Sequence, residues 1–101
     1  VLDEIAIVLK DLPNSLRVEG HTDNIPVRTA QFPSNWDLSS ARAIRILKYF
    51  FDRHGFDPSK LSASGYGEFR PVETNDTPIG RAKNRRVDIM VMQGEVVPFT
   101  Q

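Results

Sequence analysis

Apolar and polar residues recur with two different periods along the chain, and these periods predict its helices and strands. Leucine and isoleucine stand at helical spacing near the start (LDEIAIVLKDL), and this first helix should end near Asp11 or Leu12, because Pro13 disfavours helical geometry before it. Residues 16–20 and 61–66 alternate with a period of two, as half-buried strands do. Val87, Ile89 and Val91 predict a final strand by the same alternation.

The strongest helical pattern runs from about Ser40 to Arg53. One side of this predicted helix is apolar and the other is charged, and the apolar side consists of Ala43, Ile44, Ile46, Leu47, Phe50 and Phe51. We expect Ser39 to be the N-cap and Gly55 to end the helix. Thr77 and Pro78 predict the cap and first turn of a short helix across residues 80–83.

The order strand, helix, strand predicts a βαβ unit whose two strands are parallel. The final strand should join them antiparallel, giving a fold of the α/β class (an α+β sandwich) with helices on one face of a small mixed sheet. Residues 24–37 contain two prolines and predict a loop. We expect one domain over residues 1–92 and a loose tail over residues 93–101.

Composition narrows the functional classes. The 101 residues fit one small domain, and 13 Lys and Arg balance 13 Asp and Glu, so no net field draws the chain to nucleic acid or anionic lipid. The absence of cysteine excludes disulfides and thiolate metal sites. Apolar runs are shorter than the ~18–20 residues that cross a bilayer. Any recognition site must therefore be local.

The first predicted strand leads into a polar segment, within VEGHTDNIPV. Loops at the carboxyl ends of parallel strands commonly carry ligand sites, and Asp23 stands at such an end. Asp23 could bind a ligand cation, or it could accept a hydrogen bond from its own loop in an Asx-turn. The sequence alone leaves both open.

Arg42 is the second candidate residue. In the first turn of the predicted helix it would face the positive end of the macrodipole, at a cost of ~0.3–1 kcal/mol, so an anion should lie nearby. That anion could be a ligand carboxylate or phosphate, or the side chain of Asp37. Paired with Asp23, Arg42 would suit an α-amino acid group, whose ammonium and carboxylate need opposite partners.

Other polar residues carry weaker chemistry. His21 and Asp23 show a metal-like spacing, but a catalytic zinc generally needs three protein ligands and His54 lies at the far end of a helix. We expect no metal, no cofactor and no enzymatic activity, because no nucleophile and base can be paired from these spacings.

A basic run comprises Arg81, Lys83, Arg85 and Arg86. It lacks the interleaved aromatic residues of nucleic-acid sites, so we expect no nucleic-acid partner. Arg85 and Arg86 are adjacent at a strand entrance, so their side chains should point to opposite sides, and one of them could line the same site as Arg42.

Four separated segments resemble the OmpA-like peptidoglycan-binding domain in order and spacing: VEGHTDNIPV, FPSNWDLSSARA, LSASGYGEFRPV and TPIGRAKNRRVDIMV. The resemblance implies that this domain binds peptidoglycan peptide stems, especially meso-diaminopimelate, through the aspartate of HTD and the arginine of LSxxRA. These are Asp23 and Arg42 here. Thr22, Asn35, Asn84, and Arg85 or Arg86 are carried over as further ligand-binding or supporting residues.

The long loop and the FPSNW segment resemble the MotB-type branch, the stator subunit of the bacterial flagellar motor. The resemblance implies a periplasmic, wall-anchoring domain of an inner-membrane protein, a homodimer, and a channel-forming partner subunit bound through a membrane segment outside this sequence. The alternatives are a general tether between outer membrane and wall, of the OmpA or lipoprotein type, and an enzyme acting on peptidoglycan.

Two features depart from the family pattern. The family's first strand is absent before the first helix, and Val1 enters the helical pattern without a capping residue, so we expect a fragment that lacks an edge strand. The acidic residue usual after the TP pair is Ile79 here.

Overall fold

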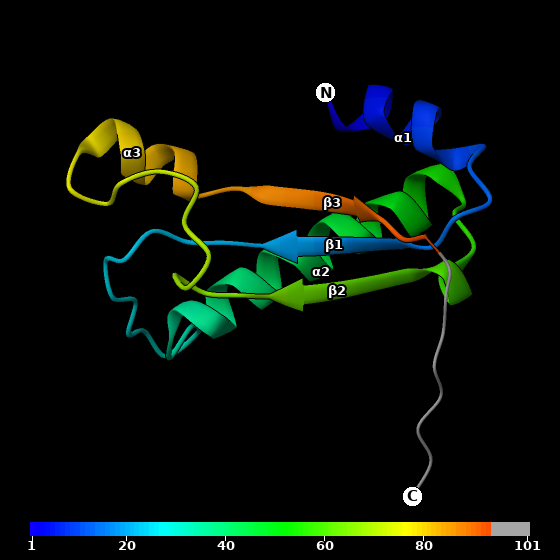
Figure 1. Ribbon diagram of the computed structural model, residues 1–101. Coiled ribbons are helices and arrows are strands. Elements are labelled where there is room, and N and C mark those ends of the chain that lie inside the picture. The colour runs from blue at the N-terminus through cyan, green and yellow to red at the C-terminus, as the bar shows by residue number, and fades with distance from the viewer. Residues whose placement is uncertain (94–101) are drawn as a thin grey trace, which may run out of the picture.

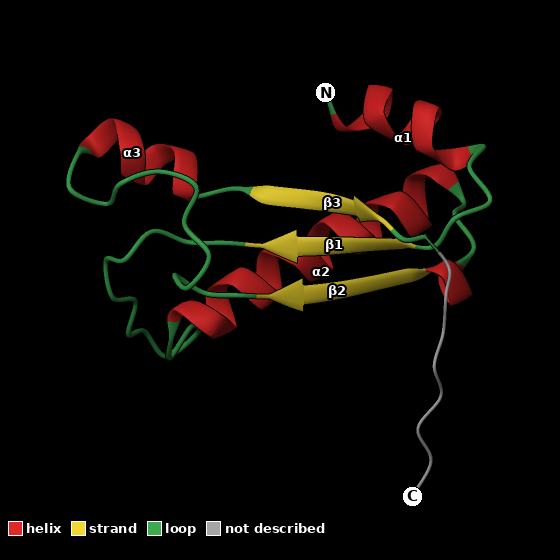
Figure 2. Cartoon of the chain, in the orientation of Figure 1, coloured by secondary structure: helices red, strands yellow, loops and turns green. Residues whose placement is uncertain are grey.

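The computed structural model describes residues 1–93, and these form a small sheet with helices packed against it (Figures 1 and 2). The elements in chain order are α1 (Leu2–Lys10), β1 (Leu16–Gly20), α2 (Asn35–His54), the 3₁₀ turn η1 (Pro58–Lys60), β2 (Leu61–Gly65), α3 (Pro78–Asn84) and β3 (Val87–Val91). The predicted tail, apart from Gln93, lies outside the described residues. No helix within residues 1–93 is long and apolar enough to cross a bilayer.

The sheet has the order β2-β1-β3, with β1 in the centre. β1 pairs in parallel with β2, Leu16 opposite Leu61, and antiparallel with β3, Leu16 opposite Val91. The predicted βαβ unit, the antiparallel last strand and the mixed α+β class are confirmed. β1 has the predicted bounds, and β2 ends at Gly65, one residue before the predicted Tyr66.

One face of the sheet is covered by α2, which crosses behind the strands in Figure 1, while α1 packs beside it. The centre of the core is formed by Ala6, Leu16, Phe50 and Phe56. Helix and sheet approach closely at Gly20, where an added Cβ would lie 2.0 Å from the carbonyl oxygen of Ser39. A side chain at position 20 would therefore separate α2 from β1.

The start of α2 differs from the prediction. Ser34 is the N-cap, and its Oγ accepts a hydrogen bond from the Asp37 amide (3.2 Å) and donates one to the Asp37 carboxylate (2.7 Å). This reciprocal capping adds a turn and a half before Ser39, which is fully buried inside the helix. The prediction of Ser39 as N-cap is therefore wrong, whereas Gly55 does end α2, with a φ of 65°.

The buried stripe of α2 is also narrower than predicted. Ile44 and Phe51 are nearly half exposed, and the buried positions are Asn35, Ser39, Ala43 and Phe50. A three-stranded sheet contacts only a thin strip of a helix, so the outer residues of a wide apolar arc stay in solvent. Polar residues consequently lie in the helix–sheet contact close to the carboxyl ends of the strands.

Candidate binding site at the carboxyl end of the central strand

The candidate site begins just after β1, where backbone hydrogen bonds hold His21 and Thr22 in place. The His21 amide donates to the Arg86 carbonyl and the Thr22 amide donates to the Gly67 carbonyl, both at 2.9 Å. Thr22 is buried, and its Oγ1 donates to the Asp23 carbonyl at 2.8 Å. These bonds continue the pairing of β1 past its last residue and fix the backbone that presents Asp23.

Both oxygens of the Asp23 carboxylate already have protein partners. Oδ1 accepts a hydrogen bond from the Ile25 amide at 3.0 Å, which is the Asx-turn that the sequence left open. Oδ2 accepts a 2.6 Å hydrogen bond from Nη1 of Arg85, in a charge-assisted ion pair. The Asp23 side chain is almost fully buried, whereas that of Arg85 is 45% exposed. The pair therefore has a fixed anion and a cation that solvent or a ligand can reach.

Asn35, the first residue of α2, ties the helix to this loop. Its Nδ2 donates to the Ile25 carbonyl at 3.2 Å and, more weakly, to the Asp23 carbonyl at 3.5 Å. These two acceptors fix the orientation of the amide, and its buried Oδ1 has no hydrogen-bond partner within residues 1–93. Asn35 therefore positions the backbone around Asp23 from the helix side.

Arg42 lies in the interior of α2, seven residues after Asn35, so the expectation that it occupies the first helical turn is wrong. The alternative pairing with Asp37 is also wrong, because the Asp37 carboxylate is bound to Ser34. Arg42 is partly buried and forms no salt bridge within residues 1–93. It lies seven residues before Tyr49, on the same flank of α2, and the Tyr49 hydroxyl donates to Asp3 of α1.

Arg85 and Arg86 point in opposite directions, as their adjacency predicted. Arg85 reaches Asp23, whereas Arg86 donates to the Asp88 carboxylate at 3.1 Å and to the Arg70 carbonyl at 3.0 Å. Of the two, the structure places Arg85 beside Asp23. Sequence alone could not choose between them, because the choice depends on how α3 turns into β3.

Asn84 is fully buried and fastens the loop before α3. Its Oδ1 accepts from the Val72 and Glu73 amides at 2.9 and 3.0 Å, and its Nδ2 donates to the Glu73 carbonyl and to Asn75 Oδ1 at 2.9 and 2.8 Å. All four bonds go to this loop. The Asn84 side chain thus supports the segment before Arg85 and presents no free polar atom to a ligand.

An aromatic pair borders the same end of the sheet. Trp36 of α2 and Phe69 after β2 are both largely exposed, and their ring centroids lie 4.8 Å apart. Beside them, a shallow hollow opens between residues 26–35 and Glu68. The carboxyl ends of β1 and β2 therefore combine charged groups with exposed aromatic surface.

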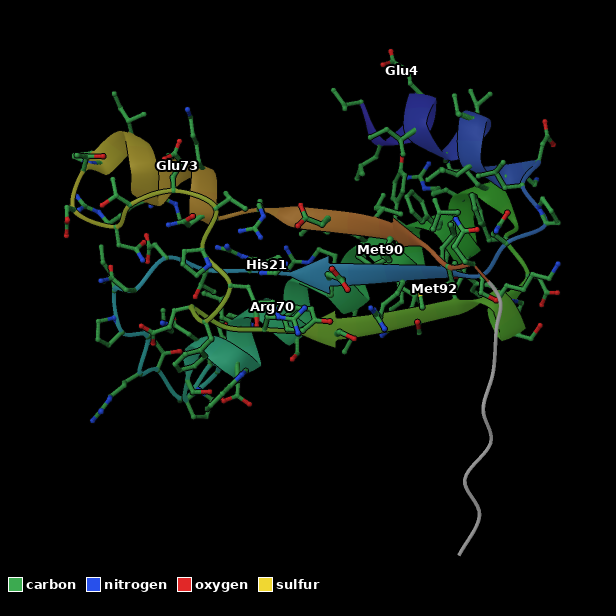
Figure 3. The ribbon with its side chains drawn as sticks, in the orientation of Figure 1. Glu4, His21, Arg70, Glu73, Met90 and Met92 are labelled. Atoms are coloured by element: carbon green, nitrogen blue, oxygen red, sulfur yellow. The ribbon has the colours of Figure 1, made fainter. Side chains whose placement is uncertain are left out.

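The sheet face opposite α2 carries a second polar group of residues, which sequence reasoning missed. His21 is only 2% exposed and stacks on Tyr66 with a centroid separation of 5.2 Å. Burial, and then the nearby charge of Arg86, lowers the pKa of His21. The signal was present in the sequence, because Glu19 and His21 stand two positions apart and so project to the same side of the extended chain, opposite to Val18 and Gly20. Figure 3 shows His21 on this open face, with Arg70 and Met90.

The lowered pKa of His21 predicts a loss of stability in mild acid. Below its usual value of 6.5 the unfolded imidazole binds a proton that the folded one resists, so the free energy of unfolding should decrease as pH falls through this range. Urea unfolding from about pH 7.5 to about pH 5.5 measures the effect. His21→Gln should flatten the profile, and a slope that survives this substitution would contradict the assignment.

This fold and these charged side chains, gathered where two parallel strands end, define an α+β binding domain. The chain belongs to the OmpA family, whose family model matches residues 1–85. The family resemblance drawn from the four motifs is thereby confirmed.

The relatives include a cell wall anchor and motility proteins. The chain is 41% identical over 80 residues to motility protein B of Bacillus subtilis, covering 79% of this chain and 31% of that protein. It resembles the C-terminal domain of Helicobacter pylori MotB (TM-score 0.83, 34% identity, 92% of this chain and 70% of that one). It also resembles the cell wall anchor of the T6SS from Pseudomonas aeruginosa (TM-score 0.82, 41% identity, 89% and 62%). The chain thus spans about a third of its curated motility relative.

Proposed function

We propose that this domain is a non-catalytic peptidoglycan-binding module that anchors a larger protein to the cell wall. The observation that carries the proposal is the end of β1, where Arg85 holds a buried Asp23 carboxylate. The helix that packs on this strand, α2, carries Arg42, which forms no salt bridge among residues 1–93. The similarity to a cell wall anchor and to MotB periplasmic domains supports the same function.

The ligand chemistry follows from the charges. A free amino acid group, such as the side-chain end of meso-diaminopimelate in a peptide stem, has an ammonium for Asp23 and a carboxylate for a guanidinium. Arg42 supplies that guanidinium. The ammonium takes the place of Arg85 on Asp23 Oδ2, and the exposure of Arg85 allows it to move aside at modest cost.

The wider setting follows from the MotB-type relatives. The domain would lie in the periplasm as part of an inner-membrane stator subunit, act as a homodimer, and hold a channel-forming partner stationary against the rotor. A general tether between outer membrane and wall remains the second candidate, because outer membrane porins are also among the relatives, one of them 44% identical over 77 residues. A membrane-spanning helix encoded upstream would favour the stator.

Co-sedimentation with purified insoluble peptidoglycan tests the binding function. We expect the parent domain to pellet with the wall, and Arg42→Ala and Asp23→Asn each to weaken binding at least about tenfold, as loss of a charge-assisted bond predicts. Arg45→Ala, another arginine removed from an exposed position of α2, is the matched control and should bind normally. Full binding by a folded Arg42→Ala domain would refute the site.

The identity of the stem residue needs a separate measurement. A soluble stem peptide ending in diaminopimelate should compete with the wall, whereas the same peptide with lysine, which lacks the side-chain carboxylate, should compete poorly. Equal competition by both peptides would remove Arg42 from carboxylate recognition while leaving wall binding itself intact.

A further inference from the structure

We propose that Glu19, His21 and Asp88 form a binding site for a divalent transition metal ion such as Zn²⁺. The three side chains lie on the open face of the sheet, and one ligand atom from each falls within 4.8 Å of the other two. This site is separate from Asp23, whose carboxylate is turned to Ile25 and Arg85.

The strand register brings the three residues together. Glu19 of β1 stands directly opposite Asp88 of β3 in the antiparallel pair, so their side chains project from the same face. His21 follows Glu19 by two positions, on a segment that still hydrogen-bonds to the strand entrance at Arg86, and therefore projects to that face as well. Two neighbouring strands thus supply all three ligands from a rigid part of the fold.

The imidazole of His21 provides independent support for a ligand. His21 is 2% exposed, yet neither Nδ1 nor Nε2 has a hydrogen-bond partner within residues 1–93. Buried polar groups in folded proteins are seldom left without a partner, and a bound ion or water commonly satisfies those that lack one from the protein. Nε2 lies 3.5 Å from Asp88 Oδ2, so the unused nitrogen points at the carboxylates. A metal ion bound by the Asp88 carboxylate beside this nitrogen would give Nε2 a partner.

The chemistry of the donors selects the kind of metal. One imidazole and two carboxylates, completed by water, suit Zn²⁺ and related transition metals, whereas Mg²⁺ and Ca²⁺ prefer oxygen ligands alone. Asp88 is 46% exposed, which leaves an approach for the ion from solvent.

Two arginines and a tyrosine compete for the same carboxylates. Arg17 and Tyr66 donate to Glu19 Oε2 at 2.9 and 3.1 Å, and Arg86 donates to Asp88 Oδ2 at 3.1 Å. The second oxygen of each carboxylate accepts no hydrogen bond within residues 1–93, so each can bind a metal while keeping its arginine. Those cationic partners weaken the attraction for the ion, and the site should be selective for imidazole-preferring metals without being very tight.

Calorimetric titration of the domain with zinc chloride tests this site, combined with NMR of the histidine rings. We expect one ion per chain, a shift of the His21 ring signals, and an affinity at least about tenfold lower in Asp88→Asn and in Glu19→Gln. Asp88 is partly exposed, so its variant should stay folded, and circular dichroism verifies this.

The matched control is the other histidine beside an acid. His54 Nε2 lies 2.7 Å from Asp3 Oδ1, between the last residue of α2 and the first turn of α1, and neither residue belongs to the proposed site. Asp3→Asn and His54→Gln should therefore leave zinc binding unchanged. Absence of any zinc binding, or binding that is lost in His54→Gln and kept in Asp88→Asn, would overturn the proposal.

Discussion

Replacing Gly20 by alanine should lower the free energy of unfolding by about 3 kcal/mol or more, at the upper end of the range for overpacking a close contact. The new Cβ would lie 2.0 Å from the carbonyl oxygen of Ser39 and 2.9 Å from its carbonyl carbon, both backbone atoms in α2. A flexible side chain could turn away, but the backbone of a long helix cannot. The helix must move away from β1, and urea unfolding at constant pH measures the cost.

The control for Gly20→Ala is Ser62→Ala, a small substitution at an exposed position of the neighbouring strand β2. It should change stability by no more than about 0.5 kcal/mol. A shifted helix also changes the position of Arg42 relative to Asp23, so Gly20→Ala should bind peptidoglycan more weakly even where it remains folded. Stability equal to that of the parent would show that α2 can move at no cost, contrary to the packing described above.

Replacing Asn84 by alanine should also cost about 3 kcal/mol, because it removes a side chain that makes four hydrogen bonds from a fully buried position. Two backbone amides and one carbonyl of the loop before α3 lose their partner at once. The loop should then open locally before the sheet unfolds, which hydrogen exchange at the Val72 and Glu73 amides would detect.

Two further variants separate these bonds from simple loss of volume. Asn84→Asp keeps the acceptor for Val72 and Glu73 and loses the donor, so its stability should lie between that of the parent and of Asn84→Ala. Asn24→Ala removes an exposed asparagine and should be neutral. If Asn84→Ala proved as stable as Asn24→Ala, Asn84 would have no role in holding the loop.

The two parallel strands could be predicted from sequence because apolar and polar residues alternate along each of them. Residues 16–20 alternate strictly, and so do residues 61–66, so the first strand was placed with its observed bounds and the second to within one residue of its end. The start of α2 was missed because its first turn, Asn35 to Leu38, has no apolar period. The local signal for the helix start was the three-residue spacing of Ser34 and Asp37, whose hydrogen bonds cap α2 although its first turn lacks apolar residues at helical spacing.

The candidate site could be reached only in part. Asp23 could be selected from its place at a strand end. Arg42 was selected because it was expected in the first turn of α2, but α2 begins at Asn35 and Arg42 lies in its interior. Arg42 remains a candidate for a different reason, because it has no salt-bridge partner within residues 1–93. The contact between Arg85 and Asp23 spans 62 positions, and the group of Glu19, His21 and Asp88 depends on strand register, so no local pattern predicts either.

The central place of β1 has a mechanical consequence. The chain enters β1 from the end where α1 lies and leaves it at Asp23, so a pull between α1 and a ligand held at Asp23 acts along this strand (Figure 1). Hydrogen bonds to β2 and β3 run across that direction, and such a load shears both ladders together. The bonds must then break collectively, whereas a sideways pull on β3 would peel them apart one by one. The domain should therefore resist force most strongly along the line that joins its chain entry to its proposed ligand.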